Sequence, residues 1–277
     1  MNFDAVAKTS LLTAAMRAVE NSRGENEGRL FSDPFAEVLA GREGFSILEQ
    51  FRAEEGDQNG FVLRTRYLDD RIIQGLAQGI RQIVILAAGM DTRAYRLSFP
   101  DGTRVFELDR PEVLSYKQEK LGDTLPHCIR HIVGVDLREE WQSKLIQVGM
   151  NTTERTLWLV EGLLIYLDEA AVLTLFEKIN SLSVPNSILL FDLLGRSLLD
   201  APQMANLLHF FEKLGAPWRF GLDEPEKFME QFGWTAVATQ PGEVDPARWP
   251  FPTAPRHIPD VPRYFFIEAR KLSSVFL

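Results

Sequence analysis

The chain has 277 residues, a formal net charge of −9 and 45% hydrophobic residues, which is ordinary for a globular protein with a sizeable core. No cluster of Lys and Arg stands out, which argues against nucleic acid and anionic membrane surfaces as partners. The single cysteine, Cys128, excludes a disulfide within the chain and suits a reducing, cytoplasmic location.

The first 80 residues predict a helical cap. Apolar and small residues recur at helical spacing over residues 4–21, and "LFSDPFAEVLAG" predicts a Pro-containing turn that begins a short helix. The stretch "EEGDQNG" predicts a loop, and "FVLRTRYLDDRIIQGLAQG" predicts a long helix that ends at Gly79. No signal peptide is expected, because no basic region precedes an apolar block, and no apolar run is as long as a membrane span.

From Ile83 the pattern changes to short strands that alternate with helices. This alternation predicts an α/β fold with a parallel sheet that is covered on both faces. The last two expected strands, in "WTAVATQ" and "RYFFIEARK", are joined only by a Pro-rich loop, which favours an antiparallel pair. The earlier expected strands are IVILAA, 104–109, 129–136, 156–162 and 187–194, and helices are expected to open at Asp91, Pro111, Leu137 and Asp168.

Residues 196–222 are unusually apolar and interrupt the alternation. Two interpretations stay open: an ordinary crossover helix, or a helical lid over the ligand crevice, since long connections are usually functional. We expect one domain over 1–277, made of the cap (1–80), a cofactor-binding core (81–195), the lid (196–222) and C-terminal strands (223–277). Aromatic residues are expected to wall an apolar small molecule, namely Trp218, Phe220, Trp249 and Phe251.

The ends of the predicted strands carry the candidate ligand site. In an open α/β sheet the ligand lies at the carboxyl ends of the strands, where strand order reverses. The first strand ends in Ala87-Ala88-Gly89, and the next three end in Asp109, Asp136-Leu137 and Glu161-Gly162. Asp109 stands 20 residues after Gly89, the spacing at which an acid accepts hydrogen bonds from both hydroxyls of a ribose.

These residues favour S-adenosyl-L-methionine over a dinucleotide. Two of the three glycines of the dinucleotide loop are missing, so NAD and FAD fit poorly. Glu161 suits a ligand with positive charge, and S-adenosyl-L-methionine combines a ribose with an ammonium and a sulfonium. A strand-end acid is often only a helix cap, and we assign Asp91 to that role, without a chemical function.

Other polar groups predict no site. His127 and His131 have no third ligand nearby, so no metal is expected. The acidic pairs are expected on solvated faces; they are Glu54-Glu55, Asp69-Asp70 and Glu139-Glu140.

The combination of motifs resembles the leucine carboxyl methyltransferase family, in particular its bacterial S-adenosylmethionine-dependent branch, which includes polyketide carboxyl O-methyltransferases. The resemblance covers about residues 5–195 and the final strand. It implies a class I methyltransferase (Rossmann-like) fold with seven strands, the last antiparallel. The residues that carry it are "TAAMRAVENS", "DPFA", "RTRYLDD", "QIVILAAGMDTRAYRL", "VFELDRPEV", "VDLREEW" and "EGLLIYL".

The resemblance also implies a role for each matching residue. Ala87 departs from the family, which usually has glycine there; its methyl group is expected to crowd the ligand or to require a negative φ. The implied contacts are Arg64 with the methionine carboxylate, Ala87-Ala88-Gly89 with the methionine portion, Asp109 with the ribose, Asp136 and Leu137 with the adenine, and Glu161 with the methionine ammonium.

Methyl transfer needs mainly alignment, which is worth about 7–11 kcal/mol. A carboxylate acceptor needs no base, whereas a phenol benefits from one; no catalytic residue is identified. Tyr166 lines the acceptor pocket or serves in packing. We expect O-methylation of a carboxylate or hydroxyl on an apolar small molecule. The alternatives are a protein C-terminal carboxyl, which needs an open peptide groove, and a catalytically silent binding protein; a nicotinamide oxidoreductase would need phosphate donors that the first turn lacks.

Overall fold

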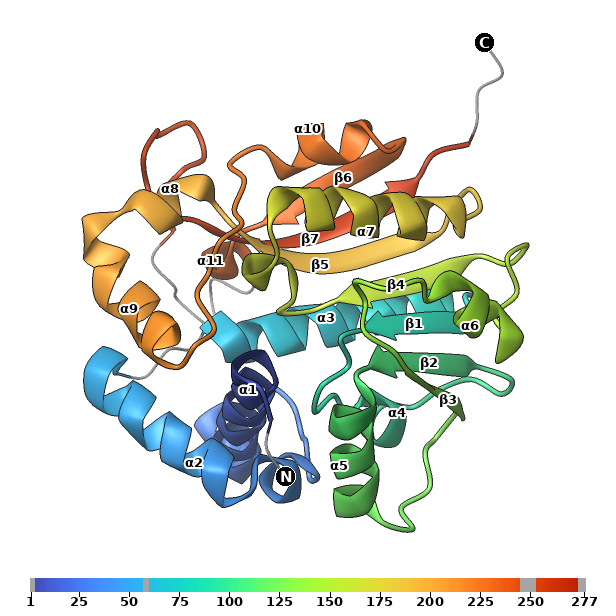
Figure 1. Ribbon diagram of the computed structural model, residues 1–277, viewed down its shortest axis with the longest axis horizontal. Helices are drawn as coiled ribbons and strands as arrows, with labels where there is room; N and C mark the ends of the chain where they lie inside the picture. Colours follow the sequence, from blue (N-terminus) through green and yellow to red (C-terminus); the bar gives the residue numbers. More distant parts are fainter. Residues whose placement is uncertain (1–2, 57–59, 245–252, 274–277) are drawn as a thin grey trace.

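The computed structural model describes residues 3–56, 60–244 and 253–273. Seven strands form one sheet in the order β3-β2-β1-β4-β5-β7-β6 (Figure 1). The pairs among β1 to β5 are parallel, and β7 is antiparallel to both of its neighbours. This confirms the predicted class I methyltransferase sheet and the predicted antiparallel end. The strands are β1 (Gln82–Leu86), β2 (Arg104–Asp109), β3 (Ile129–Gly134), β4 (Thr156–Val160), β5 (Ile188–Leu194), β6 (Trp234–Thr239) and β7 (Tyr264–Lys271).

Helices cover both faces of this sheet. Along β1, Ile83 and Ile85 pack into one core, while Val84 and Leu86 pack into the other, because successive side chains of a strand point to opposite faces. The first core is shared with α1 to α5 and α9, the second with α6, α7 and α10. The helices are α1 (Ala5–Ser22), α2 (Ala36–Glu55), α3 (Gly60–Ala77), α4 (Arg93–Arg96), α5 (Pro111–Leu121), α6 (Gln142–Gln147), α7 (Glu169–Ser181), α8 (Arg196–Asp200), α9 (Ala205–Lys213), α10 (Pro225–Glu230) and α11 (Pro241–Val244), with 3-10 turns η1 (Glu25–Glu27), η2 (Leu164–Tyr166) and η3 (Pro202–Met204).

Local capping signals explain where several helices begin. The side chain of Asp4 accepts a hydrogen bond from the Ala7 N–H at 2.8 Å, and Asp168 accepts one from Ala171 at 2.8 Å, so each side chain satisfies an N–H that the helix leaves unpaired. The expected starts at Pro111 and Asp168 are confirmed.

Three expected elements differ in length. The helix after β1 is a single turn, because its chain turns extended at Leu97. The helix expected from Leu137 begins only at Gln142. The second helix, expected to be short, runs over 20 residues across a kink at Gly41. The predicted loop 54–60 lies partly outside the described residues.

Residues 196–222 form no continuous helix. Helices α8 and α9 are separated by η3, which begins at Pro202, and the chain leaves α9 through Gly215 at φ +83°. Helix α9 is docked on α2, where the rings of Phe210 and Phe51 meet edge-on at 5.0 Å. The structure therefore shows this segment docked on the helices of the N-terminal region, and its movement as a lid stays a prediction.

Candidate functional site

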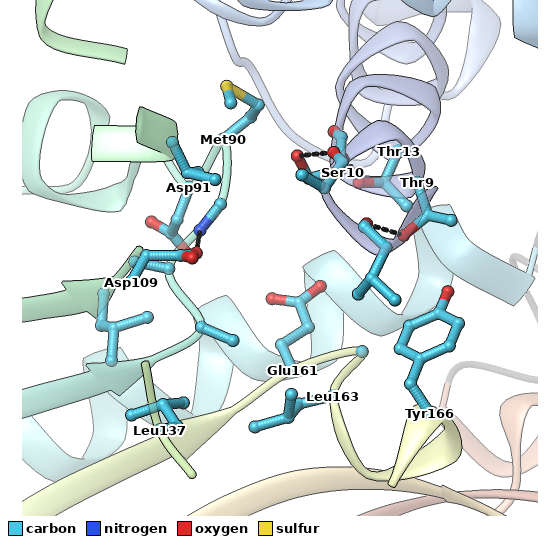
Figure 2. A pocket seen from close by; sticks show the side chains of 18 of the residues that line it. Thr9, Ser10, Thr13, Met90, Asp91, Asp109, Leu137, Glu161, Leu163 and Tyr166 are labelled. Atoms are coloured by element: carbon cyan, nitrogen blue, oxygen red, sulfur yellow. Dashed lines mark hydrogen bonds between the residues drawn. The ribbon is translucent and has the colours of Figure 1, made fainter. Parts of the chain in front are cut away.

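A cavity of about 410 Å³ lies at the carboxyl ends of β1, β2 and β4, at the switch point between β1 and β4. Its volume falls in the range of small-molecule sites. Helix α1 forms the opposite wall with Thr9, Ser10 and Thr13 (Figure 2). All the predicted site residues line it, namely Arg64, Ala87, Ala88, Gly89, Asp109, Asp136, Leu137, Glu161 and Tyr166.

The turn after β1 has an unusual backbone. Ala87 has φ +54° and Gly89 has φ +44°, so the expectation that Ala87 requires a negative φ is wrong. A Cβ added to Gly89 would lie 3.0 Å from the Cβ of Ser10, because α1 packs closely against this turn. Glycine at 89 is therefore required both by the left-handed backbone and by the close approach of α1.

Asp109 faces the cavity from the end of β2 and holds this turn in place. Its Oδ2 accepts a hydrogen bond from the Gly89 N–H at 2.7 Å, and its Oδ1 accepts one from the Arg110 N–H at 2.7 Å. Burial raises the pKa of Asp109, although these backbone donors oppose the rise. Each carboxylate oxygen has two lone pairs, so Asp109 keeps the capacity to accept hydrogen bonds from a ligand; its contact with a ribose stays a prediction.

Glu161 points from the end of β4 into the middle of the cavity (Figure 2). Its Oε1 accepts a hydrogen bond from Arg64 Nε at 2.9 Å, and its Oε2 accepts one from Arg93 Nη1 at 2.7 Å. Burial raises the pKa of Glu161, but the charges of Arg93 and Arg64 outweigh it and hold the pKa below its usual value. The carboxylate therefore stays ionised, as a partner for a cationic ligand group must.

Arg64 connects the cavity to strands β5 and β7. Its Nη1 donates to Asp192 Oδ2 at 2.9 Å and to the hydroxyl of Tyr264 at 3.1 Å. These bonds use Nε and Nη1, which leaves Nη2 for a ligand carboxylate. Asp192 also accepts the Gly162 N–H at 2.6 Å and so fixes the loop that carries Glu161. Asp192 and Tyr264 were missed, although an acid within the apolar stretch "SILLFDLL" was a signal for the first.

Two acidic residues have roles other than the expected ones. Asp91 is not a simple cap: Thr92 holds the N-cap position of α4, while Asp91 accepts the Arg93 backbone N–H at 2.7 Å and pairs with the Arg93 guanidinium. Asp69, expected on a solvated face, is 4% exposed and pairs with Arg93 at 2.7 Å and with Arg96 at 2.6 Å. Buried arginines need such carboxylates, since an unpaired buried charge is costly.

Arg93 is the further functional candidate that the sequence did not reveal. Its side chain lines the cavity, and its Nη2 is buried without a hydrogen-bond partner among the described residues. A buried donor without a partner costs about 1–3 kcal/mol, which an oxygen of a ligand would recover. An ionised Glu161 for an ammonium, Asp109 for hydroxyls, and free N–H donors for a carboxylate together fit an amino acid joined to a nucleoside.

The segment after β3 supplies the third wall. Asp136 pairs with Arg138, with 2.9 Å between Nε and Oδ1, and hydrogen bonds from Arg138 lower the pKa of Asp136 to about 2. Leu137 adds an apolar side chain. Their contact with an adenine stays a prediction.

Comparisons with known proteins identify the family. Residues 10–180 match the family model for leucine carboxyl methyltransferase. The chain belongs to the leucine carboxyl methyltransferase family. A relative from Parafrankia sp. (strain EAN1pec) is 34% identical, over 91% of this chain and 88% of its own length. A relative from Frankia alni (strain ACN14a) is 40% identical, over 84% of each chain. Both are named "Putative S-adenosyl-L-methionine-dependent methyltransferase".

A solved structure shares the fold of this family member. The crystal structure of a "putative methyltransferase" from Thermobifida fusca YX has a TM-score of 0.62 and covers 86% of this chain and 93% of its own, at 18% identity. At this low identity the likeness concerns the fold alone.

Tyr166 lies on the side of the cavity away from Asp109 (Figure 2), and it packs with Ile165. The apolar side chains of Phe61 and Phe211 also line the cavity. Burial raises the pKa of the Tyr166 phenol. The expected aromatic walls are in part wrong. Trp218 stacks on Phe211 at 4.5 Å but does not line the cavity, and Phe220 packs into the core. Trp249 and Phe251 lie outside the described residues.

Within residues 3–56, 60–244 and 253–273, no three or more His, Cys, Asp or Glu side chains are grouped so that they could hold a metal ion. Over the same residues, none of the helices combines the length and the apolarity that a membrane crossing requires.

Proposed function

We propose that this S-adenosyl-L-methionine-dependent methyltransferase methylates a carboxylate or hydroxyl oxygen on an apolar small molecule. The observation that supports this is the division of one cavity into two ends. Asp109 and Tyr166 lie on opposite sides of Glu161 (Figure 2), and the lining combines charged groups such as Arg93 with apolar side chains such as Phe211. S-adenosyl-L-methionine supplies a methyl group that its sulfonium already activates.

The residues of this chain then bind and orient. Glu161 holds the ammonium of the methyl donor, Nη2 of Arg64 and of Arg93 hold its carboxylate, and Asp109 holds the ribose hydroxyls. The network behind Arg64 keeps these groups fixed, because Asp192 joins Arg64 to the loop of Glu161. A fixed donor beside an apolar pocket reduces the entropy that alignment costs.

The cavity offers no good general base. The lining residues, all within the described part of the chain, include no His, Lys or Cys. The pKa values of Asp91, Asp136 and Glu161 are lowered, so these carboxylates are weak bases. Burial raises the pKa of Asp109, but its oxygens hold the Gly89 and Arg110 N–H groups, and its proposed role is to bind the ribose. The raised pKa of Tyr166 keeps its phenol protonated. An acceptor oxygen that arrives already ionised therefore suits this site best.

The test uses S-adenosyl-L-methionine labelled in its methyl group. The full chain is incubated with apolar carboxylic acids, with phenols and with a peptide that ends in leucine. We expect label in a small-molecule acid or phenol, with activity lost in Glu161→Ala and kept in Arg196→Gln, which removes a surface charge outside the cavity. Label in the peptide alone, or in none of the acceptors, would contradict the proposal.

A further inference from the structure

Arg219 is a cation at the cavity that no carboxylate of the described chain neutralises. Seven arginines line the cavity, and six of them have an ion pair within 4.0 Å. Arg219 is exposed, and within residues 3–56, 60–244 and 253–273 its side chain has neither an ion pair nor a hydrogen bond. The six paired arginines are Arg17, Arg64, Arg93, Arg96, Arg110 and Arg138.

The backbone of Arg219 is held by hydrogen bonds, although its guanidinium has no partner in the described part of the chain. The Arg219 N–H donates to the carbonyl oxygen of Ile165 at 2.7 Å, and the Leu222 N–H donates to that of Leu194 at 2.8 Å. Ile165 directly precedes Tyr166, and both line the cavity and pack in one apolar cluster, on the side away from Asp109 (Figure 2). The guanidinium is therefore anchored beside the acceptor end, on the segment that follows α9.

The local charge makes this position selective. The lining contains the seven arginines against six carboxylates, so Arg219 is the surplus cation. The whole chain carries a net charge of −9 and repels an anionic acceptor at long range. The guanidinium of Arg219 attracts an anionic acceptor locally and so offsets this long-range repulsion. Guanidinium groups also match the geometry of a carboxylate, to which they can donate two parallel hydrogen bonds.

We propose that Arg219 binds the carboxylate of the methyl acceptor, and that the acceptor is an apolar monocarboxylic acid. Arg219 holds one oxygen, and the other oxygen takes the methyl group. The transfer forms the O–C bond of the ester, breaks the C–S bond of the donor, leaves the electron pair on sulfur and moves no proton. The ester is neutral, so Arg219 distinguishes the substrate from the product and favours product release.

This inference rests on the proposed function and is tested by binding. Octanoate and phenylbutyrate, each with its methyl ester and its alcohol, are titrated into the protein saturated with S-adenosylhomocysteine, the demethylated donor. We expect the acids to bind the native protein more tightly than their esters and alcohols. In Arg219→Gln the affinity for the acids should fall about tenfold, as for one lost charge-assisted hydrogen bond, with ester and alcohol binding unchanged.

Control variants separate the possible explanations. Arg219→Lys keeps the charge and should retain part of the acid affinity, and Arg196→Gln should retain all of it. Unchanged donor affinity in Arg219→Gln shows that the variant is folded. The proposal is overturned if acids bind no more tightly than alcohols, if Arg219→Gln leaves acid binding intact, or if that variant loses donor affinity instead.

The experiments distinguish a failure of the proposed function from a failure of the Arg219 site. Acids that bind through Arg219 but never become labelled would refute the methyl transfer and keep the carboxylate site. Phenols that become labelled equally well in Arg219→Gln would support the methyl transfer and refute the carboxylate site.

Discussion

Ala87 is the residue whose backbone conformation conflicts most with its side chain. Among the described residues other than glycine, three have a positive φ, namely Ala87, Asn186 and Asp260. Asn and Asp tolerate the left-handed region because their short polar side chains hydrogen-bond locally, whereas Ala has no such compensation and pays about 1–2 kcal/mol. The substitution Ala87→Gly removes this cost.

The expected gain in the free energy of unfolding is smaller than the strain energy that the substitution relieves. Glycine adds about 0.4–1 kcal/mol of conformational entropy to the unfolded chain, and the partly buried methyl group contributes a fraction of ~0.8 kcal/mol. Ala87→Gly should therefore change the free energy of unfolding by between about 0 and +1 kcal/mol. Ala88 is 4% exposed and has no positive φ, so Ala88→Gly should lose roughly 1.5 kcal/mol.

Urea unfolding, followed by tryptophan fluorescence, measures both variants against the native chain. The two neighbouring substitutions should differ by roughly 2 kcal/mol, the difference between the two values above. Donor affinity should be unchanged or higher in Ala87→Gly, because Ala87 lines the cavity and the substitution removes atoms there. If Ala87→Gly destabilises the protein as much as Ala88→Gly does, the backbone strain at Ala87 is refuted.

Three further predictions follow from the site. Asp109→Ala should weaken donor binding by about 1.5–3 kcal/mol for each charge-assisted hydrogen bond that is lost, as measured by calorimetry; an unchanged affinity would remove Asp109 from the donor site. Asp91→Ala should cost about 3 kcal/mol of unfolding free energy at pH 7, because it leaves buried Arg93 with one partner fewer. Burial raises the pKa of Asp91, but nearby cations, Arg93 first, outweigh burial and lower the pKa from 3.8 to about 2. The stability that ionised Asp91 contributes is therefore complete above pH ~4 and is lost as the pH falls towards 2. In acid unfolding, the native chain should show this loss of stability and Asp91→Ala should not. In hydrogen exchange, the amides of 196–222 should exchange faster than those of β1 in the free protein and become protected when demethylated donor and acceptor are bound; equally slow exchange before any ligand is added would make the segment part of the core.

The sequence predicted those elements whose signals are local. The apolar stretch at 104–109, Pro111 at a helix start and Asp168 as a cap each carry their own information, and the structure reproduces all three. Most of the candidate site residues, such as Asp109 and Glu161, stand at the ends of strands, and parallel strands bring their carboxyl ends to one edge of the sheet. Arg64 lies on α3 and Tyr166 on η2, so strand ends gave no signal for them, and they were predicted only from the family resemblance and from closeness in sequence to Glu161.

Residues whose role depends on distant partners were missed. Asp69 lies on α3 and meets Arg93 and Arg96 only when the turn after β1 packs against that helix, so nothing next to it in the sequence distinguishes it from a solvated acid. Asp192 and Tyr264 reach Arg64 across the sheet from β5 and β7. Such ion pairs depend on tertiary packing, which periodicity and spacing do not encode.

Isothermal titration of the full chain with S-adenosyl-L-methionine tests the central claim most directly. The account predicts saturable binding with one site per chain, which persists in EDTA and is lost or strongly weakened in Glu161→Ala, while NADH gives no heat. Absence of heat with both S-adenosyl-L-methionine and S-adenosylhomocysteine, or binding that a chelator abolishes, would contradict it.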